Sequence, residues 1–238
     1  MDLEKNIRAV QERIAAAAAQ AGRDPAEITL CAATKVQTDE TIRAAIAAGI
    51  QVCGENRVQE LAAHLEGDAY AGAREVHFIG HLQTNKVNKV VGRVDLIHSV
   101  DSGHLLQAID RQAEKLGIVQ DILLEVNIAG EQSKSGVLPE QAEELARQAA
   151  AMAHVRLRGL MAIPPVAQEP GGNTHYFVKM RQLFVDIREK IADNERDMDC
   201  LSMGMSGDYE SAIAQGATLV RVGTALFGPR PPMTAPRA

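Results

Sequence analysis

Short apolar runs recur along this chain, on average roughly every 25 to 30 residues, and this repetition restricts the fold more than any other feature of the sequence. The runs show little of the alternation expected of half-exposed strands, which is typical of parallel strands buried on both faces. The eight predicted strands lie at 28–35, 50–56, 75–80, 95–100, 121–128, 155–163, 198–204 and 218–223.

Helical patterns separate these runs, and one helix precedes the first of them. Over 3–21, apolar residues recur at three- and four-residue spacing from Leu3 to Ile14. Further helices are predicted at 38–48, 56–66, 84–91, 101–116, 139–153, 174–192 and 207–215, with a short final helix after the last strand. Eight such units fit a closed (β/α)8 TIM barrel with an extra N-terminal helix better than an open doubly wound sheet.

The length and composition suit one such domain. The chain has 238 residues, only 3% of them aromatic and none of them Trp, so aliphatic side chains must fill the core. Neither a linker nor a shift in composition divides the sequence. We therefore expect a single barrel over 1–228 and a Pro-rich, loose tail over 229–238.

Charge and hydropathy argue against nucleic-acid and membrane partners. The formal net charge is −6, which gives no electrostatic attraction to phosphate backbones or anionic lipid. No run approaches the ~18 uncharged apolar residues of a membrane span, and the charged N-terminus lacks the apolar segment of a signal peptide. These features predict a cytoplasmic protein.

The cysteines predict neither a disulfide framework nor a metal site. Cys31, Cys53 and Cys200 are odd in number, widely spaced and set in apolar segments, so each is expected to be a small buried residue. His77 and His81 are four residues apart, but they flank a strand end rather than share a helix face. The sequence predicts no metal ligand set.

Lys35 stands at the carboxyl end of the first predicted strand, where barrels of this class carry their active sites. Period-two alternation places it on the same face as Cys31 and Ala33, whose small side chains leave room for a ligand. A partly desolvated lysine there would be a good carbonyl nucleophile. From position alone, a lysine that simply reaches solvent explains the residue equally well.

The last two strand ends both combine glycine with a hydroxyl residue. Ser206-Gly207 follows the seventh strand and Gly223-Thr224 follows the eighth. Glycine permits close backbone approach, and free N–H groups at a helix start attract anions. One such pair is explained by ordinary helix capping, but two in adjacent units favour a phosphate site, for which these two loops are the common place.

Arg221 lies within the apolar eighth strand, two residues before Gly223. A buried guanidinium needs an acceptor or an anion as partner. Beside a phosphate site, it could face a ring nitrogen of the ligand. A strand-end lysine, a phosphate site and an arginine together are the parts that pyridoxal 5′-phosphate requires.

Six segments resemble a known family in the same order along the chain. They are AATK (32–35), GENRVQE (54–60), HFIGHLQTNK (77–86), RGLMAI (158–163), LSMGMSGDY (201–209) and VRVGTALFG (220–228). They resemble the pyridoxal phosphate homeostasis proteins, the YggS/PROSC family, which in turn are similar to the N-terminal barrel of bacterial alanine racemase. The resemblance covers about residue 5 to 228.

The resemblance implies roles for individual residues. Lys35 would carry pyridoxal phosphate as a Schiff base, and Arg221 would face the pyridine nitrogen. The residues that the resemblance places at the phosphate or beside the ring are Asn56, Met203, Ser206, Gly207, Gly223 and Thr224. His81 stands where the family more often has a proline or a small residue, and neither His81 nor the Glu131–Gly136 loop receives a role.

The resemblance also implies a carrier that buffers or delivers the cofactor, with apo-enzymes that use it as acceptors. The alternative is an amino-acid racemase of low activity. Racemases of this fold take a second acid–base tyrosine from a separate C-terminal domain across a dimer, and none of Tyr70, Tyr176 and Tyr209 matches that motif. We therefore expect a monomer that binds the cofactor without established turnover.

Overall fold

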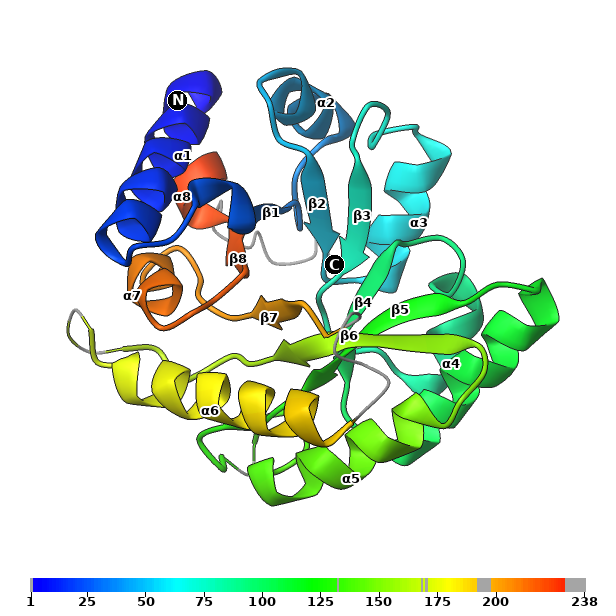
Figure 1. Ribbon diagram of the computed structural model, residues 1–238. Helices are drawn as coiled ribbons and strands as arrows, with labels where there is room; N and C mark the ends of the chain where they lie inside the picture. Colours follow the sequence, from blue (N-terminus) through cyan, green and yellow to red (C-terminus); the bar gives the residue numbers. More distant parts are fainter. Residues whose placement is uncertain (1, 132, 168, 170, 192–197, 230–238) are drawn as a thin grey trace.

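Eight parallel strands close into a barrel in the computed structural model, which describes residues 2–131, 133–167, 169, 171–191 and 198–229. Each strand pairs with the next along the chain, and the first pairs with the eighth. The strands are β1 (Thr29–Ala33), β2 (Val52–Glu55), β3 (Glu75–Phe78), β4 (Leu96–Val100), β5 (Gln120–Glu125), β6 (Val155–Met161), β7 (Cys200–Ser202) and β8 (Leu219–Val222). The predicted (β/α)8 barrel is confirmed (Figure 1).

Helices surround the barrel. They are α1 (Leu3–Gln20), α2 (Asp39–Ala47), α3 (Val58–Glu66), α4 (Gly103–Leu116), α5 (Pro139–Ala150), α6 (Thr174–Lys190), α7 (Tyr209–Ala214) and α8 (Thr224–Phe227), with the 3-10 helices η1 (Pro25–Glu27) and η2 (Thr84–Lys89). Side-chain caps start several of them: the oxygens of Asp2, Thr38 and Ser102 accept backbone N–H groups of α1, α2 and α4.

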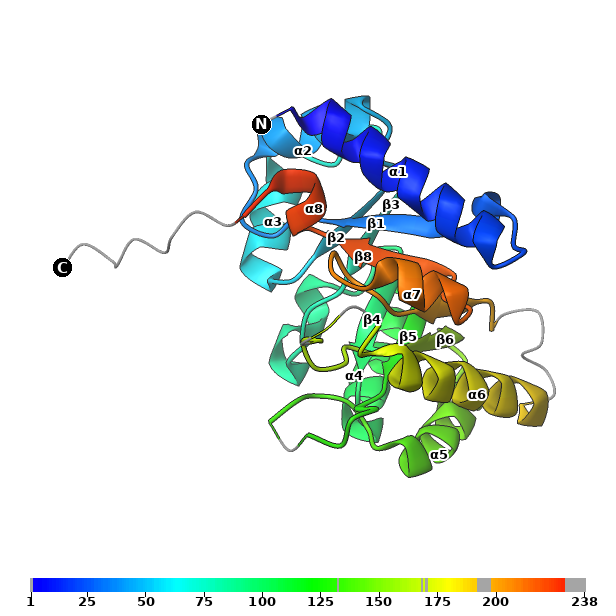
Figure 2. The same cartoon turned by 90° about the vertical axis from the view of Figure 1, so that its left-hand side faces the viewer.

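The predicted N-terminal helix, α1, compensates for the shortness of α8. Helix α8 has only four residues, too few to cover the wall formed by β8 and β1. Helix α1 packs along α7 and α8 on this side of the barrel (Figure 2). The side-chain amide of Asn6 donates to the carbonyl of Leu226 over 2.9 Å, which ties the first helix to the last.

The apolar residues form two layers separated by the strands. The larger lies between strands and helices; the smaller fills the barrel and contains Cys31, Val52, Ile79, Leu96, Leu123, Met161, Cys200 and Leu219. All three cysteines are buried free thiols, as predicted. Burial raises the pKa of Cys53 and of Cys200 to about 12, so neither is a thiolate at neutral pH.

One predicted helix differs in type. The segment expected as a helix over 84–91 is η2, in which Lys86 N–H donates to the carbonyl of Gln83 and Val90 N–H to that of Val87. Asn and β-branched residues weaken a short α-helix here, and Gly92 follows at φ 76°. Residue 192 of the predicted helix over 174–192 and residues 230–238 of the predicted tail lie outside the described residues.

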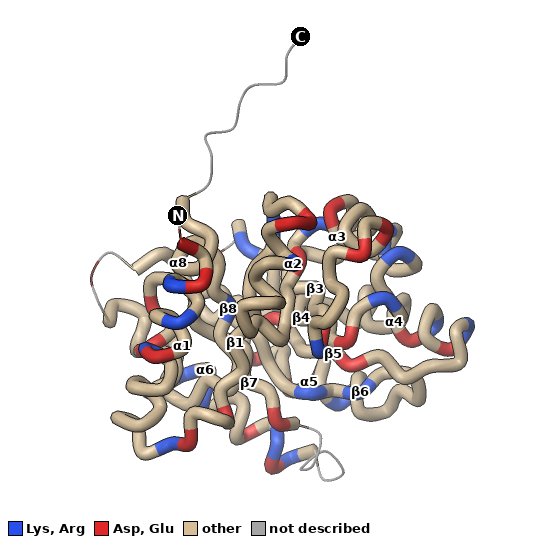
Figure 3. Tube along the Cα trace, turned by 90° about the horizontal axis from the view of Figure 1, so that it is seen from above, with Lys and Arg blue, Asp and Glu red and all other residues tan. Residues whose placement is uncertain are grey.

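Lys and Arg residues are interspersed with Asp and Glu residues along the helices (Figure 3). Among the described residues, no helix is both long enough and apolar enough to cross a bilayer.

Candidate functional site

A cavity of about 510 Å³ opens at the carboxyl ends of the strands. The residues lining it are Ala33, Lys35, Asn56, Ile79, Ile163, Pro165, Val166, Ala167, Met205, Ser206, Gly207, Asp208, Arg221, Gly223 and Thr224. Seven of the eight residues that the sequence predicted as a site are therefore brought to one place. They come from loops and strands at both ends of the chain, because β1 and β8 are neighbours in the closed barrel.

Lys35 reaches the cavity from a tight turn directly after β1. The turn runs from Thr34 to Gln37, whose N–H donates to the Thr34 carbonyl over 3.0 Å. At its centre Val36 has φ 59°, a left-handed conformation that is unfavourable for a β-branched residue. The Val36 N–H donates to the Glu60 carboxylate on α3 over 2.9 Å. That contact holds a strained turn in the form that keeps Lys35 at the cavity.

Asn56 enters the cavity from the end of β2. The buried carboxylate of Glu55 accepts the Asn56 N–H over 2.6 Å and the Arg57 N–H over 3.3 Å, which fixes the backbone there. The Oδ1 of Asn56 is buried and has no hydrogen-bond partner among the described residues. A buried acceptor of this kind is costly unless a ligand supplies the donor.

Ser206 and the start of α8 form a cup of hydrogen-bond donors. The Ser206 Oγ accepts the backbone N–H of Gly223 over 3.2 Å and that of Ala225 over 3.3 Å. Because this hydroxyl oxygen accepts from two backbone amides, its own proton can donate to a further acceptor. A Cβ added to Gly207, on the facing loop, would meet no heavy atom within 4 Å, which leaves that side of the cup open.

Arg221 lies almost wholly buried at the floor of the cavity, with 4% of its surface exposed. Its Nη1 donates to the Ser202 carbonyl over 3.0 Å and to the Ser202 Oγ at shorter range, and its Nη2 donates to the Ala162 carbonyl over 2.8 Å. Burial lowers the pKa of the guanidinium, and the thiol of Cys31 and the carboxylate of Glu125 oppose that shift. Arginine stays charged even so.

Met203 is the predicted site residue that does not line the cavity. It is fully buried in the layer between strands and helices, because Ser202 points into the barrel and the next residue along a strand points the other way. Met205 lines the cavity instead. The alternation of inward and outward residues along the strand would have placed Met203 outside the barrel interior.

Asp208 and an apolar rim were not predicted. The Asp208 carboxylate accepts the Met205 N–H and the Asn173 side-chain amide, both over 2.7 Å, and so shapes the loop after β7. Ile163 and Val166 are exposed apolar residues of the loop after β6, with Val166 91% exposed. This segment lies between the strand predicted at 155–163 and the helix predicted at 174–192, and the sequence did not indicate its place at the cavity mouth.

The loop that the sequence left without a role lies beside this rim. Within it, the Asn127 side chain binds the backbone of Glu131, and Lys134 Nζ donates to the carbonyl of Ile163 over 3.5 Å. His81 is exposed, with its Nδ1 3.3 Å from the Ser135 Oγ, whereas His77 lies inside the barrel. Among the described residues, no group of three or more His, Cys, Asp or Glu side chains is arranged to hold a metal ion.

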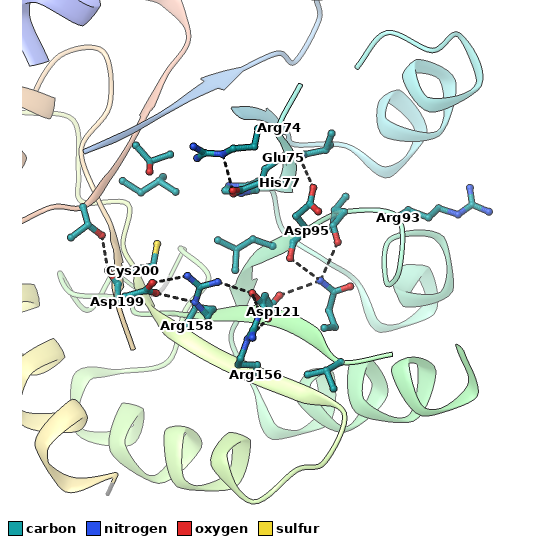
Figure 4. A pocket seen from close by; sticks show the side chains of 18 of the residues that line it. Arg74, Glu75, His77, Arg93, Asp95, Asp121, Arg156, Arg158, Asp199 and Cys200 are labelled. Carbon is teal, nitrogen blue, oxygen red and sulfur yellow. Dashed lines mark hydrogen bonds and ion pairs between the residues drawn. The ribbon is translucent and has the colours of Figure 1, made fainter. Parts of the chain in front are cut away.

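A larger hollow, of about 800 Å³, lies at the amino ends of the strands. Charged side chains line it and pair with one another: Arg158 bridges Asp121 and Asp199, each over 2.7 Å (Figure 4). In (β/α)8 barrels this face usually contributes to stability, whereas ligands bind at the carboxyl ends of the strands. The charged side chains at this end are therefore explained by their ion pairs, and we expect the ligand site at the carboxyl ends of the strands.

Comparisons with known proteins agree with this geometry. The family described as "Alanine racemase, N-terminal domain" matches residues 3–231. A protein of Aquifex aeolicus is 43% identical over 97% of this chain and 99% of its own length, and one of Pseudomonas aeruginosa is 40% identical over 96% of each. Both are named pyridoxal phosphate homeostasis protein.

A solved structure is also similar over nearly the whole chain. It is PipY of Synechococcus elongatus with PLP bound, which is 34% identical with a TM-score of 0.79 and covers 92% of this chain and 100% of its own. With relatives this similar over almost their full length, the chain belongs to the pyridoxal phosphate homeostasis protein family.

Proposed function

We propose that this protein holds pyridoxal 5′-phosphate as a Schiff base on Lys35 and serves to buffer and deliver the cofactor. The observation that carries the proposal is the single cavity that unites a lysine, a cup of backbone amides and a buried arginine. Two relatives named for pyridoxal phosphate homeostasis and a similar structure with PLP bound support it.

Each group has a task that its surroundings fit. Pyridoxal phosphate supplies an aldehyde that condenses reversibly with a primary amine and releases water. Lys35 provides that amine at the cavity wall. The Ser206 hydroxyl, whose oxygen accepts the N–H groups of Gly223 and Ala225, donates its proton to a phosphate oxygen, and Thr224 and Gly207 border it. The unsatisfied Oδ1 of Asn56 accepts a donor of the ligand.

Arg221 bears on the choice between carrier and enzyme. A fixed cation beside the pyridine nitrogen disfavours protonation of that nitrogen, which weakens the ring as an electron sink. Racemisation also needs a second acid or base opposite the lysine. Among the described residues that line the cavity, the ionisable ones are Lys35, Asp208 and Arg221, and Asp208 already accepts two hydrogen bonds. These features favour a carrier over a low-activity racemase.

The exposed apolar rim suits reversible loading. Ile163 and Val166 are exposed apolar residues at the cavity mouth. Their side chains make no hydrogen bond that would have to break when the cofactor enters or leaves. In this proposal the protein works as a cytoplasmic monomer, and apo-enzymes that require pyridoxal phosphate receive it.

The test is spectroscopic. Purified protein that has been incubated with pyridoxal phosphate and desalted should absorb in the violet region of the spectrum, and borohydride should abolish this band. Peptide mass spectrometry should then find the reduced adduct on Lys35. Lys35→Ala should show neither. Lys89→Ala, which removes an exposed lysine from η2, is the matched control and should behave as the unchanged protein.

A second measurement separates carrier from enzyme. Loaded protein mixed with an apo-enzyme should restore its activity, and chiral analysis with each L-amino acid should show no inversion above that of free pyridoxal phosphate. Inversion that depends on Lys35 would establish the racemase instead. A wild-type protein without the absorbance band would refute the binding proposal itself.

A further inference from the structure

A chain of hydrogen-bonded polar side chains, all buried except the first, crosses the interior of the barrel from one end to the other. It begins with Glu75 at the amino-end hollow, where Figure 4 shows the carboxylate beside His77, and their Oε2 and Nε2 atoms are 2.9 Å apart. His77 Nδ1 lies 3.1 Å from His98 Nε2, and His98 Nδ1 lies 3.1 Å from the Ser202 Oγ. Ser202 then contacts Arg221 at the floor of the ligand cavity.

The hydrogen bonds of this chain can all be made in one direction. Arg221 can only donate, so the Ser202 oxygen accepts from it and the Ser202 hydroxyl is left to donate to His98 Nδ1. The proton of a neutral His98 is then on Nε2, and it is donated to His77 Nδ1. The donors thus run in series from the cavity toward the amino end.

The two ends of the chain have fixed and opposite charges. His77 Nε2–H donates to Glu75, and this hydrogen bond lowers the pKa of Glu75 to about 2, so the terminal acceptor is a carboxylate at neutral pH. At the centre, burial lowers the pKa of His98 well below its ordinary value and keeps the ring neutral. A chain with a cation at one end and an anion at the other is polarised along its length.

Packing alone does not explain these residues. His77, His98 and Ser202 are 1% exposed or less and lie in a barrel interior beside apolar side chains such as Leu96 and Leu123. Buried polar groups cost free energy unless they are paired, and apolar replacements of similar volume are often at least as stable. Filling the barrel therefore does not explain why these side chains are polar.

We infer that Glu75, His77 and His98 are positioning residues, which hold the Ser202 hydroxyl as an acceptor and thereby fix the Arg221 guanidinium at the ligand cavity. If His98 carried its proton on Nδ1 instead, that N–H would also donate to the Ser202 oxygen, and the Ser202 hydroxyl proton would lose its acceptor in this series of hydrogen bonds. The role in cofactor binding rests on the proposed function, whereas the direction of the chain is a property of the protein without ligand.

The first experiment uses cofactor-free protein. Nitrogen NMR of the imidazole rings should find His98 neutral at pH 7 with its proton on Nε2, and should find that proton donated to Nδ1 of His77. In His98→Leu the side-chain N–H signals of Arg221 should shift and exchange faster with water. A proton on Nδ1 of His98, a doubly protonated His98, or Arg221 signals unchanged in His98→Leu would each overturn the inference.

The second experiment uses a matched pair of variants with pyridoxal phosphate. Asn at position 98 offers an amide oxygen near the place of Nδ1 and can still accept from Ser202, whereas Leu cannot. His98→Leu should bind the cofactor about tenfold more weakly and shift its absorbance maximum. His98→Asn should retain most of the affinity and the wild-type maximum.

Leu96→Ala is the control for general damage to the barrel interior, because Leu96 lies in the interior layer but outside the chain. It should lower the melting temperature and leave the absorbance maximum in place. A shift as large in Leu96→Ala as in His98→Leu would overturn the inference. If wild-type protein binds no cofactor, the proposed function fails, while the NMR arm still decides the positioning of Arg221.

Discussion

The hydroxyl oxygen of Ser206, after β7, accepts the backbone N–H of Gly223, after β8, over 3.2 Å. This contact joins the last two strand–helix units at the point where the sequence predicted a phosphate. Because this contact already holds the two loops together, the cup exists before a ligand arrives, and little reorganisation accompanies binding.

Replacing Ser206 with alanine should therefore affect binding more than stability. Loss of one hydroxyl partner of the phosphate is expected to weaken pyridoxal phosphate binding about tenfold, whereas the free energy of unfolding should fall by about 1 kcal/mol or less. Absorbance titration and urea denaturation measure the two effects. Ser211→Ala is the control, since Ser211 hydrogen-bonds Thr174 outside the cavity; equal affinities of the two variants would contradict the cup.

Glu125 should make stability depend on pH. Its pKa is raised to about 7 by burial and by the nearby Asp101, with Arg221 opposing. A carboxyl whose folded-state pKa exceeds its unfolded value of 4.5 destabilises the fold as pH rises between the two, here by about 3 kcal/mol. Relative to Glu125→Gln, the wild type should thus lose stability between pH 5 and pH 8 in urea denaturation.

The matched control for that measurement is Glu114→Gln, because Glu114 is exposed on α4. Its stability should follow the wild-type pH dependence. A Glu125→Gln variant with the same pH dependence as the wild type would show that Glu125 does not titrate in this range.

The strained turn beside Lys35 predicts a stabilising substitution. Val36 is 47% exposed and has φ 59°, so Val36→Gly removes steric strain while removing little buried surface. We expect the free energy of unfolding to rise by up to about 1 kcal/mol, as measured by chemical denaturation. Val119→Gly, at an exposed valine without positive φ, should lower it instead. A similar loss in both variants would argue against strain at Val36.

Gly159 in β6 predicts the opposite outcome. A Cβ there would lie 1.8 Å from the Cys200 carbonyl oxygen on β7, and its φ of 149° disfavours other residues. Gly159→Ala should destabilise the protein by more than about 3 kcal/mol, because the two strands would have to separate. Gly207→Ala, which meets nothing within 4 Å, should leave the melting temperature nearly unchanged. A stable Gly159→Ala protein would mean that the barrel can rearrange at this position.

The sequence was informative where a residue's role follows from its place along one strand. Apolar runs gave the eight strands, and the rule that strand ends meet at one edge brought Lys35, Ser206 and Arg221 together. Met203 was misplaced relative to the cavity because a family motif was preferred to the alternation that starts at Ser202. Segment 84–91 was predicted as a helix, and its apolar spacing does not distinguish an α-helix from the 3-10 helix found there.

Relationships across the barrel were beyond such an approach. His98 lies within an apolar run, and nothing near it in sequence indicates that it contacts both His77 and Ser202. Those contacts depend on the stagger of the strands around the barrel, which a single sequence does not specify. The polar chain from Glu75 to Arg221 therefore emerged only from the structure.

The pairing of β1 with β8 also affects when the site can form during synthesis of the chain. The lysine lies near the start of the chain and the cup near its end, and they become neighbours only when the barrel closes. A ribosome-bound chain that has emerged as far as β7 would offer an amine to passing aldehydes but no cup to select among them. If Lys35 binds pyridoxal phosphate as proposed, selective loading requires the finished chain.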